Sequence, residues 1–142
     1  MRVAAANGHL AVVRHLIEQN AEVNARISTN STSLRAAANR GHFDILRCLV
    51  ENGAEVNARE IDLSTPLMVA CYNDHIDVAS YLVVNGADIH LEDRIGDTAL
   101  HDAARRGHVE LVSKLLALGA EQKLLFIFIF NCSLSLGQTL GK

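Results

Sequence analysis

The chain has 142 residues, of which 49% are apolar, and it carries a formal net charge of −3. This length and apolar content suit one domain with a continuous core, and the scattered lysines and arginines form no basic stripe of the kind that binds nucleic acid. Only 4% of the residues are aromatic, which excludes a stacking platform for bases and leaves Leu, Val, Ile and Ala to build the core.

A pattern of paired helices recurs every 33 residues, without insertion, from the first residues to about residue 123. The first helix of each pair has small residues on its inner face. The second has apolar residues at i, i+3, i+6 and i+7, which form one stripe against a neighbour. Helices are expected at 1–7, 10–18, 33–40, 43–51, 66–73, 76–84, 99–106 and 109–117. Met1 takes the place of Leu34 and Leu67, so we expect a truncated first copy, from a longer array or a gene model that starts late.

Two turn positions in each copy need a left-handed backbone: the residue before each His and the residue before each Ala-acid pair. Glycine holds six of these eight positions, namely Gly8, Gly41, Gly53, Gly86, Gly107 and Gly119. The other two are Asn20 and Asp74, and Asn and Asp tolerate that conformation best among the other residues. A hydroxyl also precedes three of the first helices, at Thr32, Thr65 and Thr98, where it can cap free backbone amides.

The repeat pattern stops near Lys123, and the apolar run 124–130 follows it. Seven apolar residues are too few to span a bilayer, and the uncharged, proline-free composition is typical of an aggregation-prone segment. Two interpretations of the 124–142 tail remain open. One is a foreign end, such as a translated intron or a truncation scar, and the other is a cap over the last repeat, which repeat arrays need for solubility.

No group of residues indicates catalysis. His9, His42, His75 and His108 occur once per repeat, in layers about 8–10 Å apart, so no two of them can share a metal ion at about 2 Å. His101 and Asp102 are helix neighbours that point in different directions. We therefore expect no enzyme activity, no cofactor and no metal.

Three cysteines, Cys48, Cys71 and Cys132, are an odd number without C-x-x-C spacing. This favours reduced thiols in a reducing compartment, with Cys71 inert at a packed position. Repeat sequence begins directly after Met1-Arg2-Val3, so we expect no signal peptide. A cytoplasmic location is expected, and an additional nuclear location stays open.

The 33-residue period, with openings such as Thr65-Pro66-Leu67 and Thr98-Ala99-Leu100-His101, resembles the ankyrin repeat. The resemblance implies an all-α ankyrin-repeat α-solenoid with short β-hairpin fingers between the repeats. The implied repeats are 1–24 (truncated), 25–57, 58–90 and 91–123, followed by the non-repeat tail. Fingers at 24–31, 57–64 and 90–97 do not build the core, so we expect their side chains to be free for binding.

Particular residues within the repeats indicate a resemblance to one family of ankyrin-repeat proteins. The resemblance is carried by Thr29-Asn30-Ser31-Thr32, by Leu67-Met68 before Cys71-Tyr72, and by Asp97-Thr98-Ala99-Leu100-His101-Asp102. Over about residues 3–123, the chain looks like the middle ankyrin repeats of the Fem (feminisation) family. Arg35 and Met68 replace the histidine of the usual opening. Fem proteins are substrate receptors of cullin-RING ubiquitin ligases that grip C-terminal degrons on the concave face. The resemblance therefore implies a peptide-binding surface in a degradation pathway.

Two departures from that family bear on function. Arg40 matches the family's acidic residue that pairs with the degron arginine, so either the ligand is acidic there or degron binding is lost. The family's earlier repeats and its cullin-binding box are also absent from these 142 residues. Cullin-RING machinery could therefore be reached only through segments that are not part of this sequence.

We expect a protein or peptide ligand on the concave face, and no nucleic acid or membrane. The candidate binding residues are the ends of the inner helices and the fingers, namely Asn39, Arg40, Tyr72, Asn73, Arg105, Arg106, Arg26, Arg59, Asp62 and Arg94. Each of them has an alternative interpretation as a solvated surface side chain. For the whole chain, the alternative is a plain ankyrin scaffold or inhibitor module without a ubiquitin role.

Overall fold

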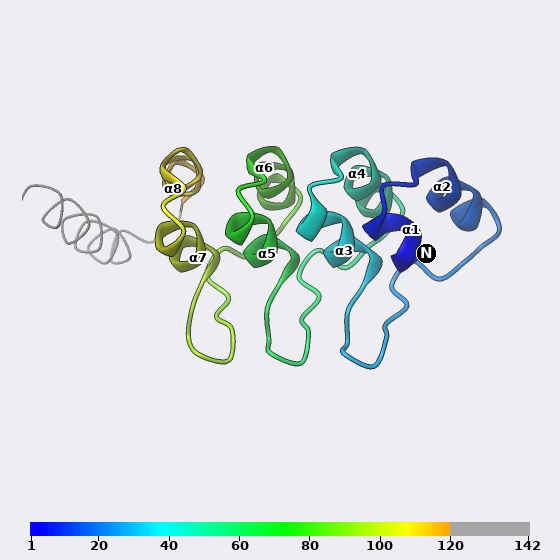
Figure 1. The fold of residues 1–142 in the computed structure, drawn as a ribbon, viewed down its shortest axis with the longest axis horizontal. Coiled ribbons are helices and arrows are strands. Elements are labelled where there is room, and N and C mark those ends of the chain that lie inside the picture. Colours follow the sequence, from blue (N-terminus) through cyan, green and yellow to red (C-terminus); the bar gives the residue numbers. More distant parts are fainter. Residues whose placement is uncertain (120–142) are drawn as a thin grey trace, which may run out of the picture.

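The computed structural model describes residues 1–119, and the 124–142 tail lies outside the described residues. The described part is a row of helix pairs in two layers, joined by long loops that extend to one side (Figure 1). The inner layer holds α1 (Arg2–Ala6), α3 (Ser33–Arg40), α5 (Pro66–Tyr72) and α7 (Ala99–Arg105). The outer layer holds α2 (Leu10–Glu18), α4 (Phe43–Glu51), α6 (Ile76–Val84) and α8 (Val109–Ala117). The predicted all-α solenoid is confirmed.

Small side chains allow the inner helices to approach closely. One repeat position is held by Ala37, Ala70 and Ala103, which are each 0% exposed. The next position is held by Ala5, Ala38 and Cys71, which are also fully buried. Leucines fill the space between the two layers, and Leu46, Leu49, Leu82 and Leu111 are inaccessible to solvent. The core is therefore continuous along the stack and contains no large aromatic side chain.

The start of each later inner helix is held by its threonine, but in three different ways. The Thr32 hydroxyl accepts from the amide of Arg35, and the Thr65 hydroxyl from the amide of Met68. The Met68 sulfur in turn accepts the Thr65 amide at 3.4 Å. In α7, the Thr98 amide donates to Nδ1 of His101 at 3.1 Å. Met68 thus performs the capping role of the histidine that it replaces.

All eight predicted turn positions have positive φ, including Asn20 and Asp74, both at 60°. A third such position occurs once per finger, at Asn30, Leu63 and Gly96. The sequence pattern does not reveal this position, because only one of the three residues is a glycine. Leu63, at φ 65°, is the costly case, since a bulky side chain strains a left-handed backbone.

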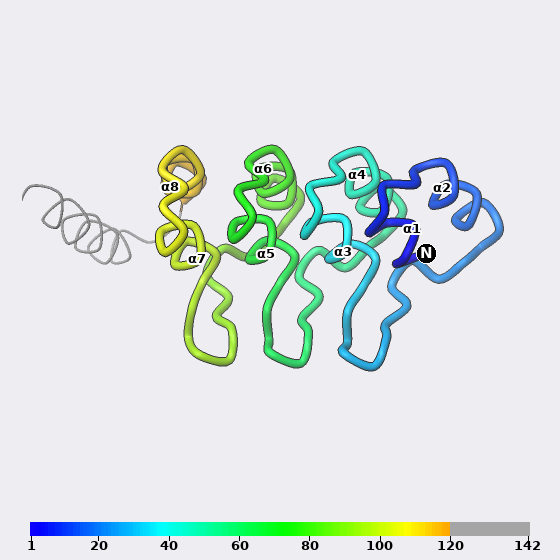
Figure 2. Tube along the Cα trace, in the orientation of Figure 1, coloured from blue at the N-terminus to red at the C-terminus, as the bar shows by residue number. Residues whose placement is uncertain are grey.

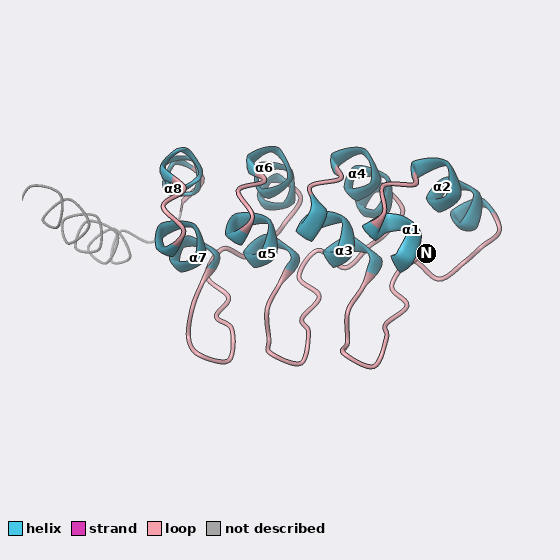
Figure 3. Cartoon of the chain, viewed as in Figure 1, coloured by secondary structure: helices cyan, strands magenta, loops and turns pink. Residues whose placement is uncertain are grey.

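The fingers are hairpin-shaped loops rather than β-hairpins. Over residues 1–119 the structure has no strand (Figure 3). Only two backbone bonds close each finger. The amides of Ile27, Glu60 and Asp93 donate to the carbonyls of Ser31, Ser64 and Asp97, and the amides of Asn30, Leu63 and Gly96 donate back to the carbonyls of Ile27, Glu60 and Asp93. The chain trace shows the three fingers side by side at the same edge of the stack (Figure 2). The predicted β-pairing is therefore wrong, because the two arms of each finger make too few ladder bonds.

Candidate protein-interaction surface

Six of the ten predicted binding residues lie together at the C-terminal ends of the inner helices. We call Asn39, Arg40, Tyr72, Asn73, Arg105 and Arg106 the helix-end row. The row is ordered because residues 33 apart occupy the same place in successive repeats. Asn73 Nδ2 links two repeats by donating to Asn39 Oδ1 at 3.1 Å, and it also donates to the carbonyl of Val69 at 2.9 Å.

Tyr72 and Arg106 form the aromatic part of the helix-end row. Tyr72 is 43% exposed, and the Arg106 guanidinium carbon lies 4.6 Å from the centre of its ring. This distance is within the range of a cation–π contact. The Tyr72 carbonyl faces Nε2 of His108 at 3.0 Å, which ties the end of α5 to the next repeat. Tyr72 is therefore held in place while much of its surface stays open to a ligand.

Arg40 and Arg105 differ although both are cations of the same row. Arg105 pairs with Asp97, and its other nitrogen lies 3.6 Å from Asp102. The hydrogen bond to Asp97, more than any other effect, raises the pKa of Arg105 above its ordinary value. Arg40 is exposed and has no hydrogen-bond or ion-pair partner among the described residues. Arg40 can thus accept an external anion without losing an internal one, which Arg105 cannot do.

Asp102 is the most perturbed carboxylate in the described part of the chain. Burial raises its pKa to about 6, Arg105 opposes this shift, and Asp97 and Asp93 add repulsion. Asp102 therefore changes charge near neutral pH, next to Arg105 in the helix-end row.

We expect Asp102 to titrate with a midpoint near pH 6, measured by carbon-detected NMR of its side-chain carboxyl. Because the folded protein holds this proton more tightly than the unfolded chain, Asp102 makes folding more favourable as the pH falls from 7 towards 4. Arg105→Gln should raise the midpoint further by removing the opposing cation. Asp62 is the internal comparison, and a midpoint for Asp102 at or below 4 would contradict the expected shift.

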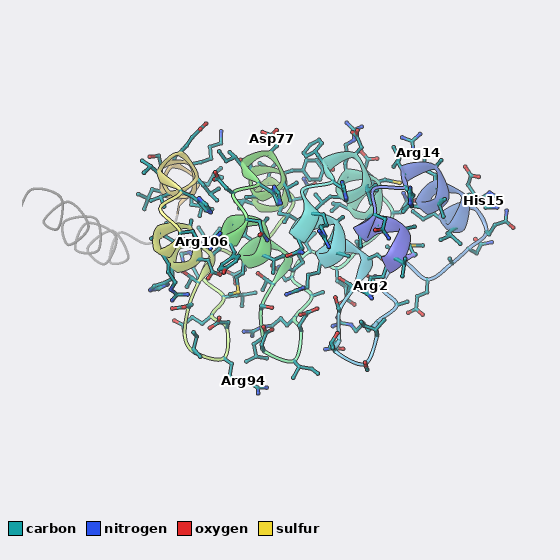
Figure 4. The ribbon with its side chains drawn as sticks, in the orientation of Figure 1. Arg2, Arg14, His15, Asp77, Arg94 and Arg106 are labelled. Atoms are coloured by element: carbon teal, nitrogen blue, oxygen red, sulfur yellow. The ribbon has the colours of Figure 1, made fainter. Side chains whose placement is uncertain are left out.

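The three finger arginines are engaged inside the protein rather than free. Arg26 donates to the carbonyl of Arg59 at 3.2 Å and pairs with Glu55, and Arg59 donates to the carbonyl of Glu92. Arg94, near the tip of its finger (Figure 4), donates to the carbonyl of Ile61 at 2.6 Å. These bonds join each finger to its neighbour. The expectation that finger side chains are free is therefore wrong for all three.

Asp62 also has a local structural role. Its carboxylate accepts from the hydroxyl and the amide of Ser64, at 2.7 and 3.0 Å. Burial pushes the pKa of Asp62 up, but the Ser64 hydrogen bonds and the Arg35 charge outweigh it, and the pKa lies below its ordinary value. Asp62 thus shapes the second finger.

Sequence reasoning missed one ion pair near these residues. Arg35 in α3 pairs with Glu60 of the next finger at 3.1 Å, and both side chains are largely buried. The fingers also expose apolar side chains, with Ile61 at 55% and Ile95 at 77%. Opposite charges 25 residues apart give no local signal for the pair. Both isoleucines lie in the fingers, so their exposure agrees with the expectation that finger side chains do not build the core.

Other sites of chemistry are not evident in the described part of the chain. Within residues 1–119, no group of three or more His, Cys, Asp or Glu side chains could hold a metal ion. Burial raises the pKa of the Cys71 thiol far above its ordinary value, so the thiol stays neutral and unreactive. An open cleft of about 450 Å³ between α2 and α4 is lined largely by charged side chains, including Arg14 and Arg47. This composition is unlike the apolar walls of small-molecule sites.

Helix pairs stacked in a row, with Tyr, Arg and Asn side chains along one edge, define a helical repeat protein. A family model described as ankyrin repeats in three copies matches residues 1–93 and 60–125. The chain belongs to the ankyrin-repeat family, whose members are non-enzymatic scaffolds for protein–protein interaction. A search of curated proteins finds no match. None of the helices described is long and apolar enough to cross a membrane.

Proposed function

We propose that this chain binds a peptide segment of a partner protein along the helix-end row, as the substrate-recognition part of a Fem-type cullin-RING ubiquitin-ligase receptor. The observation that carries the binding role is the exposed, ordered row that contains Tyr72 and the unpaired Arg40. Tyr and Arg are the residue types that most often dominate binding energy. The ligase role is supported by the Fem-like motifs alone. In this proposal the chain acts in the cytoplasm or nucleus, and it is not an enzyme.

Arg40 sets the charge of the ligand. A guanidinium that is exposed and unpaired attracts a carboxylate and repels another arginine. The ligand therefore carries an anion at this point, either an acidic side chain or the carboxylate of its own C-terminus. This differs from a Fem ligand, whose arginine meets an acidic residue at the position of Arg40.

A plain scaffold or inhibitor module is the second candidate. The observation that favours it is the internal use of the three finger arginines and Arg105, which reduces the charged groups left for a ligand. The full-length transcript distinguishes the two candidates. A downstream cullin-binding box supports the receptor, while a transcript without one favours the scaffold.

Arg40→Asp should invert the charge preference of the peptide ligand. On an array of peptides with free C-termini, we expect wild-type protein to disfavour terminal arginine and the variant to prefer it. Binding of a labelled protein to each spot is the measurement, and amidated copies of the peptides show whether the terminal carboxylate is read. Equal preference for terminal arginine in both proteins would refute this assignment of Arg40.

A further inference from the structure

We infer that the helix-end row selects an extended acidic segment with two carboxylates about six residues apart and an apolar side chain between them. This inference rests on the proposed peptide-binding function and adds the chemistry of the ligand to it. It follows from the spacing of two cations, the groups between them and the charge of the fingers.

The two cations of the helix-end row that can meet a ligand are Arg40 and Arg106, which are 66 residues apart and therefore hold the same position two repeats apart. Helices in contact lie about 8–10 Å apart, so these positions are separated by about 16–20 Å. An extended chain advances about 3.3 Å per residue, which makes this separation about five or six residues. Arg40 is unpaired among the described residues, and Arg106 is exposed, lies over the Tyr72 ring and has no ion-pair partner within residues 1–119.

The repeat between these cations offers contacts of another kind. The Tyr72 ring is 43% exposed and gives an apolar surface stiffened by Arg106. Asn73 uses its amide nitrogen within the protein, which leaves its oxygen to accept from a ligand backbone. Asn39 accepts that same bond and keeps its own amide hydrogens for a ligand carbonyl. An apolar ligand residue with a hydrogen-bonded backbone therefore fits the middle of the row.

The net negative charge of the fingers and of the turns before them repels acidic ligand groups from that side of the concave face. Residues 20–32, 53–65 and 86–98, which contain these fingers and turns, hold eight carboxylates and three arginines. Arg35 and Arg105 pair with two of these carboxylates, which leaves an excess of three negative charges. The three arginines donate to neighbouring finger carbonyls, which fixes their positions, and their charges are already included in this balance. A ligand with acidic side chains is repelled by the fingers and attracted by the helix ends, which places its carboxylates at Arg40 and Arg106.

The experiment is fluorescence anisotropy with labelled ten-residue peptides and the 142-residue protein. The first peptide has two glutamates six residues apart on either side of a leucine, and the second has the same composition with the glutamates adjacent. We expect the first peptide to bind about fivefold more tightly, which is the upper range for one exposed ion pair. Arg40→Gln and Arg106→Gln should each remove this difference. Arg14→Gln is the matched control, because it removes an exposed arginine from α2 in the outer layer (Figure 4) and should change nothing.

A second test exchanges the charges of the protein and the peptide. It predicts a gain of binding, which an unfolded variant could not produce. Arg106→Glu should bind the first peptide weakly and should bind a version with lysine in place of one glutamate as tightly as wild type binds the original. Equal affinity of wild type for the two glutamate peptides would overturn the inference and leave the proposed function standing. Tighter binding of a single-stranded oligonucleotide of equal charge would also overturn it. If no peptide binds, including every member of the C-terminal array, the proposed function fails and the inference fails with it.

Discussion

Replacing Leu82 by alanine should lower the free energy of unfolding by about 3–5 kcal/mol. Leu82 lies in α6 of the third repeat, where its side chain is 0% exposed. The alanine leaves a cavity between the two helix layers, and leucine-to-alanine changes at such sites cost the lost burial together with the unfilled space. Urea unfolding followed by circular dichroism measures the change. Because whole domains are stable by only about 5–15 kcal/mol, this loss removes much of the total.

Val84→Ala is the matched control for Leu82→Ala. Val84 is in the same helix but is 76% exposed, so its replacement should change stability by no more than about 0.5 kcal/mol. A loss below about 1 kcal/mol for Leu82→Ala would mean that the third repeat is not part of the cooperative core. Since repeats are stabilised by their neighbours, Leu82→Ala should also weaken peptide binding at Tyr72 on α5 of the same repeat.

Contacts between repeats are as regular as the repeats themselves. Asn24 donates to the carbonyl of Gly53 at 3.0 Å and accepts from the amide of Glu55 at 2.8 Å, and Asn57 does the same one repeat later. His42 and His75 reach back in the same way, with Nε2 at 3.2 and 3.1 Å from the carbonyls of Ala6 and Asn39. These bonds fix the spacing of successive inner helices. They therefore also fix the spacing of the helix-end row.

The helices were predictable because the signals that define them are local and occur once per repeat. The eight turn positions, Asn20 and Asp74 included, mark the helix ends, and all of them adopt the expected left-handed backbone. The fingers were not predictable in this way. Their form depends on bonds such as Arg26 to the carbonyl of Arg59, which joins residues 33 apart through a side chain. Periodicity shows that both residues recur, but it does not show that they touch.

The candidate site also has a part that the sequence predicts and a part that it does not. The helix-end row followed from the period, because a fixed register brings Asn39 and Asn73 together in space. The pairing of Arg105 with Asp97 and the burial of Asp102 depend on three-dimensional packing, so no local pattern indicates that Arg105 is engaged while Arg40 is open. Which cations a ligand can reach is therefore learned only from the fold. The contrast between the engaged Arg105 and the open Arg40 supports both the proposed peptide binding and the acidic ligand inferred for it.

Gly41→Ala should cost about 2–4 kcal/mol of stability, which is more than a left-handed alanine alone explains. Gly41 has φ 72°, and a Cβ at this position would lie 2.5 Å from Nδ1 and 2.9 Å from Cγ of His75. The imidazole must move as a whole, because its Cγ is also too close. His75 then loses the contact of its Nε2 with the carbonyl of Asn39, which connects α3 to the following repeat.

Gly107→Ala separates the two parts of this cost. Gly107 has nearly the same φ, 75°, but among the described residues a Cβ there would meet no atom within 4 Å. It should therefore cost only the backbone strain of about 1–2 kcal/mol. Urea unfolding of both variants gives the difference, which isolates the contact between the His75 imidazole and the preceding turn. Equal losses would show that the histidine moves without penalty. A larger loss for Gly41→Ala, with weaker binding at Asn39 and Arg40, would show that this contact supports the helix-end row.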